Sequence, residues 1–123
     1  MPKSFLRSRS LAFARQRGLC FYCELPMWAD SASFFAAKHG ITLAQAKQFQ
    51  CTGEHLLARQ DGGDNSESNV VAACRHCNEH RHKYRPASAP SPTTYKEQVL
   101  RRLSQGRWFG AQVLRESRTA VRT

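Results

Sequence analysis

Apolar residues in the first half of the chain recur at helical spacing, between residues that start or stop helices. Ser10 and Gly18 are placed to begin and end a short helix over residues 11–17. Serine caps helix N-termini, and glycine readily takes the left-handed conformation just beyond their C-termini. Residues 31–50 predict two further helices, one on each side of Gly40.

A strand pair and another helix are predicted further along. Residues 49–55 are typical of a strand, and residues 61–65 carry the turn sequence Asp-Gly-Gly-Asp-Asn. The short apolar run at residues 69–72 can return as the second strand of a hairpin. Residues 78–84 then predict a helix that ends before Pro86.

The last part of the chain combines a proline- and serine-rich connector with a basic helical extension. The connector, residues 86–93, favours an extended and semi-rigid backbone. A capping box that starts at Thr94 opens the extension, residues 94–123. The whole of residues 1–123 is the length of one ordinary domain, so the pattern predicts a small single-domain α+β fold.

The formal net charge of +10 is concentrated at the two ends of the chain. Residues 1–19 and 95–123 carry the excess of lysine and arginine, whereas basic and acidic residues balance in residues 20–94. This distribution favours ends that grip a polyanion, with DNA as the expected partner; the alternative is that these are ordinary solvated helix faces. Candidate phosphate contacts in the ends are Arg15, Arg17, Arg101 and Arg102.

Neither a membrane segment nor an export signal is expected. No apolar run approaches the roughly 20 residues that a membrane span needs. The first residues are basic but lack the apolar region of a signal peptide, so a cytoplasmic protein with no membrane partner is expected. The five cysteines are an odd number, and in a reducing compartment they favour metal binding over disulfides.

Four of the cysteines form two C-x-x-C pairs, at Cys20/Cys23 and Cys74/Cys77. A single pair could arise by chance or serve redox chemistry. Two pairs more often form a tetrahedral structural zinc site, which here would join the N-terminal segment to the later one. Cys51 is the odd cysteine, and a buried thiol is the favoured interpretation over a substitute zinc ligand.

Other polar residues remain after the cysteines are assigned. Glu54, Asn78 and His82 offer a carboxylate, an amide oxygen and an imidazole, a set that suits a divalent ion with open water positions. His55 faces the other side of the predicted strand and could accept a proton from water. The alternative is a zinc-stabilised scaffold whose histidines only cap turns.

These residues resemble a known family when they are taken together. Glu54-His55, Asp61-Gly62-Gly63, Asn69 and the run Cys74-x-x-Cys77-Asn78-x-x-x-His82-Lys83 are similar to the HNH (His-Asn-His) endonuclease family, in its zinc-knuckle subgroup with paired C-x-x-C. The resemblance implies a ββα-metal finger, a hairpin followed by a helix around one catalytic ion, with the HNH core at residues 17–85 and flanking helices.

The resemblance also implies roles for individual residues. His55 would be the general base, and Asn69 would fix the hairpin loop and orient that base. Glu54 and Asn78 would bind the catalytic ion, Mg²⁺, Mn²⁺ or another divalent ion, with His82 as a further ligand or a phosphate contact. The implied reaction is hydrolysis of DNA phosphodiester bonds, as nicks or double-strand breaks, that leaves 5′-phosphate and 3′-hydroxyl ends, by a monomer or a homodimer.

Several basic residues and two competing functions complete the expectations. Arg81, Lys83 and Arg85 could clamp the phosphate backbone. His80 is expected on another helix face, and His76 is expected to be exposed between the cysteines. The alternatives to a DNA endonuclease are a non-catalytic zinc-finger module that binds DNA, and a ribonuclease.

Overall fold

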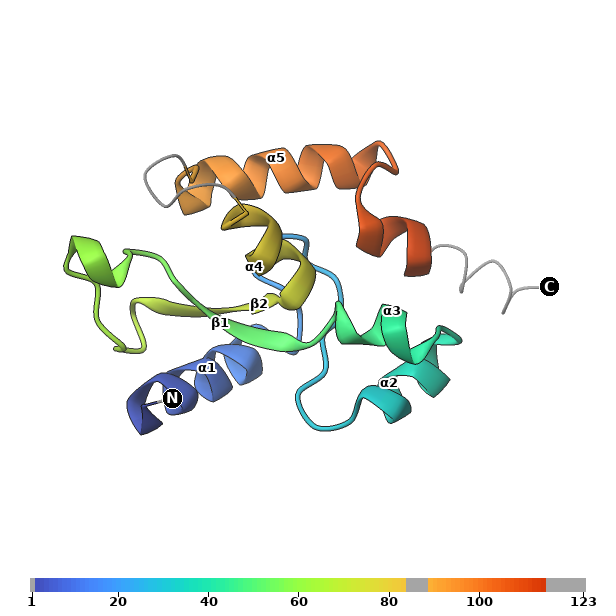
Figure 1. The fold of residues 1–123 in the computed structure, drawn as a ribbon, viewed down its shortest axis with the longest axis horizontal. Helices are drawn as coiled ribbons and strands as arrows, with labels where there is room; N and C mark the ends of the chain where they lie inside the picture. Colours follow the sequence, from blue (N-terminus) through green and yellow to red (C-terminus); the bar gives the residue numbers. More distant parts are fainter. Residues whose placement is uncertain (1, 84–88, 115–123) are drawn as a thin grey trace.

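The computed structural model describes residues 2–83 and 89–114, which form an α+β fold around one two-stranded antiparallel sheet (Figure 1). The strands are β1 (Cys51–His55) and β2 (Val70–Cys74), joined by a loop that contains the short 3-10 helix η1 (Arg59–Asp61). The labelled α-helices are α1 (Lys3–Arg15), α2 (Ala32–His39), α3 (Leu43–Lys47), α4 (Arg75–Arg81) and α5 (Pro92–Ser104), and residues 109–114 are also helical. The predicted fold class is confirmed.

The hairpin lies between α1 and α4, with α5 beyond α4 (Figure 1). In the β1–β2 register Cys51 pairs with Cys74 and His55 with Val70. Successive residues of β1 point to opposite faces. Glu54 therefore faces α4, whereas Gly53 and His55 face α1. This alternation decides which chemical groups meet at the site.

The first helix begins earlier than the sequence predicted. A start at Ser10 is wrong, because α1 already begins at Lys3, after Pro2 at the N-cap position. Phe5 and Ala12, buried against the hairpin, lie on the same helical stripe, and this packing continues the helix through Ser10. Ser10 itself is an exposed residue inside the helix.

The helices in the middle of the chain follow their predicted signals. The side chain of Ser31 accepts the N–H of Phe34 at the start of α2, and Gly40 ends this helix with φ of 65°. Thr42 and Gln45 form a reciprocal capping box at the start of α3. In both helices the cap satisfies backbone groups that the helix leaves unpaired.

Two later helices begin before their predicted starts. Cys74 caps α4, because its Sγ accepts the N–H of Cys77, so the helix covers the second C-x-x-C instead of following it. Ser91 caps α5 through the N–H of Thr94, and Pro92 takes the first helical position. Proline is well suited to that position because no helical hydrogen bond uses its missing N–H.

The core consists of two adjoining clusters of buried side chains. The larger cluster surrounds the hairpin and includes Tyr22, Val99 and Trp108; the smaller one joins Phe35 and Phe49 near α2 and α3. Among the residues that the structure describes, none of the helices has both the length and the apolar character needed to cross a bilayer.

One glutamine side chain binds the outer edge of β2. Gln16 Oε1 accepts the N–H of Ala72 at 2.9 Å, and its Nε2 donates to the Ala72 carbonyl at 2.8 Å. Gln16 thereby pairs with Ala72 much as a neighbouring strand would. Because Ala72 is fully buried, water cannot easily replace this partner.

We therefore expect Gln16→Ala to lower the free energy of unfolding by about 1–3 kcal/mol, since it leaves a buried N–H without its acceptor. Urea denaturation of the zinc-loaded protein, followed by circular dichroism, measures this loss. Ser10→Ala on the exposed side of α1 is the control and should change stability by less than about 0.5 kcal/mol. Equal stability of the two variants would contradict the assigned role of Gln16.

Candidate active site and metal cluster

The four cysteines of the two C-x-x-C pairs come together in the larger core cluster. Their Sγ atoms all lie within 4.8 Å of one another, and all four residues are buried. With Zn–S bonds of about 2.3 Å, tetrahedral zinc places its sulfurs about 3.8 Å apart. The Sγ atoms of Cys23 and Cys74 are 4.0 Å apart, so the cluster has the dimensions of a zinc site.

The backbone around the cluster is arranged to support negative sulfur. Cys20 Sγ accepts the N–H groups of Tyr22 and Cys74, at 3.4 and 3.3 Å. Burial raises the pKa of Cys20, but hydrogen bonds from the thiols of the other three cysteines outweigh this effect and lower it well below the usual value. Hydrogen bonds with Cys20, Cys23 and Cys74 raise the pKa of Cys77, and burial and the charge of ionised Cys20 add to the penalty on a second thiolate there. A divalent cation would remove that penalty.

The fifth cysteine stays outside the cluster. Cys51 is buried, its Sγ donates to the carbonyl of Thr52, and burial raises its pKa to about 11. Among the described residues, Cys51 is not one of the four cysteines whose Sγ atoms lie together. These properties favour the buried-thiol interpretation.

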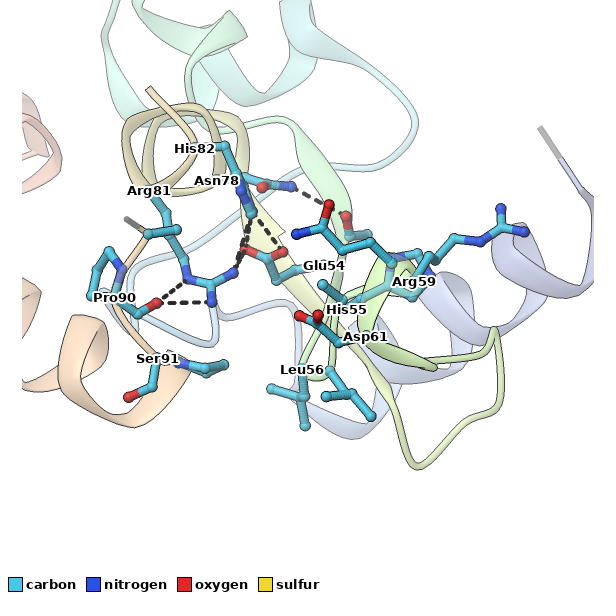
Figure 2. Close-up of a pocket in the computed structure, with 16 residues that line it drawn as sticks. Glu54, His55, Leu56, Arg59, Asp61, Asn78, Arg81, His82, Pro90 and Ser91 are labelled. Atoms are coloured by element: carbon cyan, nitrogen blue, oxygen red, sulfur yellow. Dashed lines mark hydrogen bonds and ion pairs between the residues drawn. The ribbon is translucent and has the colours of Figure 1, made fainter. Parts of the chain in front are cut away.

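A second polar cluster is centred on Glu54, whose side chain is buried in spite of its charge (Figure 2). Its Oε1 lies 2.9 Å from His82 Nε2, and its Oε2 lies 3.3 Å from Arg81 Nη1. The hydroxyl of Tyr22 donates to Oε2 at 3.3 Å. A buried carboxylate needs such partners. Here they are Tyr22, which lies between Cys20 and Cys23, and two residues at the end of α4.

Asn78 is fixed beside this carboxylate by the backbone of β1. Its Nδ2 donates to Thr52 Oγ1 at 2.9 Å and to the Gly53 carbonyl at 3.1 Å. The Thr52 hydroxyl is itself held, because it donates to the carbonyl of Ala73. Both donor positions of the amide are used, and within the described residues Asn78 Oδ1 remains free to bind a ligand. His82 follows one turn later at the C-cap of α4.

His55 lies on the opposite face of β1 and is half-buried. Its Nε2 is 2.8 Å from Asn65 Oδ1, and its ring stacks on Phe5 with 5.0 Å between centroids. Asn69 acts elsewhere in the same loop. Its amide pairs with both backbone groups of Leu57 and donates to the carbonyl of Asp64.

A cleft of about 660 Å³ brings the candidate catalytic residues together. Its walls include Glu54, His55, Asn78 and His82, along with the loop at residues 56–61 (Figure 2). Residues 89–92, which lead into α5, close another side. The four residues singled out from the sequence thus share one cavity. Asn69 does not line it.

The predicted phosphate contacts differ in their placement. Arg81 is turned inward, with 9% of its side chain exposed, and it donates to the carbonyl of Pro90 as well as pairing with Glu54. A residue that clamps phosphate would be exposed, so this prediction is wrong for Arg81. The arginine is buried because the buried carboxylate of Glu54 needs a counter-ion. Arg85 lies outside the described residues. The remaining candidates are exposed: Lys83, Arg15, Arg17, Arg101 and Arg102.

The histidines of α4 that lie off the cleft belong to an aromatic group. His76 stacks with His80 and meets the edge of Trp108 at 5.0 Å between centroids. The expectation that His76 is exposed is therefore wrong, and burial lowers its pKa. His80 lies on another face than His82, as expected, and also contacts Trp108.

Three residues at the site had no local signal in the sequence. Nothing in the sequence marked Tyr22 or Phe5 as part of a site, and Asn65 stood out only as part of the predicted turn. Their roles arise from contacts with residues far along the chain, with Glu54 for Tyr22 and with His55 for the other two.

Comparison with known proteins agrees with this geometry. Residues 43–84 match the model of the HNH endonuclease family, a stretch that contains β1, the loop, β2 and α4. No curated protein and no solved structure matches the chain. The resemblance drawn from the sequence is confirmed over this stretch: residues 43–84 are similar to the HNH endonuclease family, and a four-cysteine cluster suited to a metal accompanies them.

Loss of one cluster thiol tests this metal assignment. We expect Cys74→Ser to lose one equivalent of bound zinc and to unfold at a markedly lower temperature, because Cys74 joins β2 to α4. Elemental analysis and thermal denaturation measure the two effects. Cys51→Ser is the matched control, which should keep its zinc. A Cys74→Ser protein that is well folded without metal would contradict the structural role.

Proposed function

We propose that this protein is a metal-dependent endonuclease that hydrolyses phosphodiester bonds in DNA. The observation that carries the proposal is the shared cleft, in which a candidate base and a candidate metal-ligand set reach one space from opposite faces of β1. His55 enters from the α1 side, whereas Glu54 and His82 enter from the α4 side. The HNH family match over this stretch supports the same reaction class.

The ligand set fits a divalent ion such as Mg²⁺ or Mn²⁺. Two ligands in neighbouring positions on a six-coordinate ion, each bound at about 2.1 Å, lie about 3 Å apart. Glu54 Oε1 and His82 Nε2 are already 2.9 Å apart, so both can bind one ion with little movement. Asn78 Oδ1 supplies a third, oxygen ligand from the same helix. When bound, the ion would stabilise negative charge on the phosphate and on the departing oxygen.

His55 would activate the attacking water. A proton passes from water to the imidazole, the water oxygen bonds to phosphorus, and the bond from phosphorus to the 3′-oxygen breaks. The products carry a 5′-phosphate and, once the departing oxygen is protonated, a 3′-hydroxyl. General-base catalysis of this kind contributes about 10²- to 10⁴-fold to a rate.

The zinc cluster is proposed to be purely structural. Its four cysteines are buried and would supply all four ligands of a tetrahedral zinc ion, which would leave no open position for water or substrate. Cys74 and Cys77 lie at the N-terminal end of α4, and Asn78 follows directly. A metal at the cluster therefore fixes the helix that carries ligands for the second ion.

The proposed partner is DNA, bound by the exposed basic residues near the two ends of the chain. The formal net charge is +10, and arginines on α5 and at the end of α1 are exposed. Exposed Lys83 follows directly after the cleft residue His82. Such charges bind the phosphate backbone without reading bases, which suits a nuclease that engages any nearby duplex.

Removal of the base tests the catalytic proposal. We expect the zinc-loaded wild type to nick supercoiled plasmid with Mg²⁺ or Mn²⁺, and His55→Ala to nick it about 10²- to 10⁴-fold more slowly. Gel electrophoresis of the plasmid forms measures both rates. His80→Ala is the matched control, since its ring lies off the cleft against Trp108, and it should keep the wild-type rate.

Other outcomes of that assay point to the alternative functions. If the wild type nicks no faster than His55→Ala, the enzyme proposal fails and a non-catalytic DNA-binding module is left. Single-stranded RNA offered beside the plasmid separates the two nuclease activities. Faster cleavage of the RNA would reassign the substrate.

The DNA-binding surface has its own test. In the inactive His55→Ala background, we expect Arg101→Ala/Arg102→Ala to weaken duplex binding and to reduce the slope of log K against log salt by about 0.9 for each lost phosphate contact. Fluorescence anisotropy over a salt series measures this slope. Lys38→Ala/Lys47→Ala, on the separate α2–α3 surface, removes the same charge as a control (Figure 1). Equal slopes for the two double variants would contradict a specific α5 contact.

A further inference from the structure

We propose that Asn65, held in place by α1, is the positioning residue for His55: it fixes the proton on Nε2 and leaves Nδ1 as the nitrogen that receives the proton of water. The inference rests on the proposed role of His55 as the base. It assigns a task to Asn65 and to α1, which lies outside the matched HNH stretch.

The contact between the two side chains is short and its direction is determined. Asn65 Oδ1 lies 2.8 Å from His55 Nε2. An amide oxygen only accepts hydrogen bonds, so a bond at this distance requires a proton on Nε2. In neutral imidazole the other nitrogen then carries the lone pair. Within the described residues, His55 Nδ1 has no hydrogen-bond partner.

The orientation of the Asn65 amide is set from the other side by α1. Its Nδ2 donates to Ser4 Oγ at 3.4 Å, while its Oδ1 faces His55. The backbone carbonyl of Asn65 accepts the hydroxyl of Ser8 at 2.6 Å. Ser8 is buried, and it lies one helical turn after Ser4. Two successive turns of α1 thus hold both the backbone and the side chain of Asn65.

A second restraint acts on the imidazole ring at right angles to the hydrogen bond. Phe5 stacks on His55 with an interplanar angle of 27°. Phe5 itself is fixed because it occupies the space above Gly53, where a Cβ would lie 2.4 Å from its ring. The stack limits tilting of the imidazole out of its plane. The hydrogen bond to Asn65 limits rotation of the ring about the Cβ–Cγ bond of His55.

The two asparagines of the loop therefore have different tasks. Asn69 pairs with both backbone groups of Leu57 and holds the loop closed, without contact to His55. Asn65 contacts His55 directly. A histidine with its proton on the wrong nitrogen would present a donor to the attacking water and could not act as a base.

The location of the proton can be observed directly. In zinc-loaded, full-length protein with ¹⁵N-labelled histidine, long-range ¹H–¹⁵N spectra above the imidazole pKa report which nitrogen of each ring carries hydrogen. The His55 signals are those missing from His55→Ala. We expect the Nε2–H form in the wild type and in Asn65→Asp, which keeps an acceptor. Asn65→Leu removes the acceptor at similar volume and should lose the preference for that form.

Kinetics on plasmid DNA give the second readout. We expect Asn65→Leu to lower kcat by about 10²-fold with KM little changed, because substrate contacts remain while the base is misplaced. Asn65→Asp should recover most of the rate. Glu67→Gln, an exposed change in the same loop, is the control for loop structure. Zinc content and circular dichroism confirm that each variant is folded.

Two results would overturn the inference. One is a wild-type His55 with its proton on Nδ1. The other is Asn65→Leu with an unchanged tautomer. The spectra need no activity, so this failure is distinct from failure of the proposed function, which would show as a wild type that does not cleave nucleic acid.

Discussion

Coordination by four cysteine sulfurs is the constraint on which the rest of this structure depends. Cys74 is at once the last residue of β2, the N-cap of α4 and a member of the cluster. The strand-to-helix junction is therefore tied to the N-terminal knuckle at Cys20, more than fifty residues away in sequence. A domain of this size buries limited apolar surface, so a metal bound by the four sulfurs would contribute a large share of its stability.

The same cross-link positions the chemistry. Cys77 leads directly into Asn78, and one further turn brings His82 to Glu54. On the hairpin, the strict alternation of side chains places Glu54 and His55 on opposite faces of β1 although they are neighbours in sequence. The proposed ion-binding groups and the proposed base therefore leave β1 on different faces, and each is supported by a different helix, α4 for the carboxylate and α1 for the imidazole.

Features set by neighbouring residues could be predicted from the sequence. Local rules predict the capping box at Thr42, the helix end at Gly40 and the hairpin. The spacing of the two cysteine pairs likewise predicts that they form one cluster. Features that depend on contacts between distant residues could not be predicted in this way. The inward turn of Arg81 depends on Glu54, which lies in another element.

The beginning of α1 was missed for a related reason. Its first turns contain no strong stop or start signal, and they are helical because Phe5 packs against the hairpin. The same packing brings Ser4 and Ser8 to Asn65, so the error in the helix boundary and the omission of Asn65 from the expected site have one cause. Sequence patterns report local preference, whereas this contact joins residues far apart in the chain.

The pairing of Gln16 with Ala72 also bears on how copies of this protein behave toward one another. A two-stranded sheet has two open edges, and each is a template for pairing with another chain. Gln16 occupies the edge of β2, while Trp28, which exchanges backbone hydrogen bonds with Phe49 and Cys51, covers the approach to β1. Gln16 at Ala72 and Trp28 at Cys51 thus occupy edge positions at which a further strand would otherwise pair, while the faces of the hairpin stay available to the two helices.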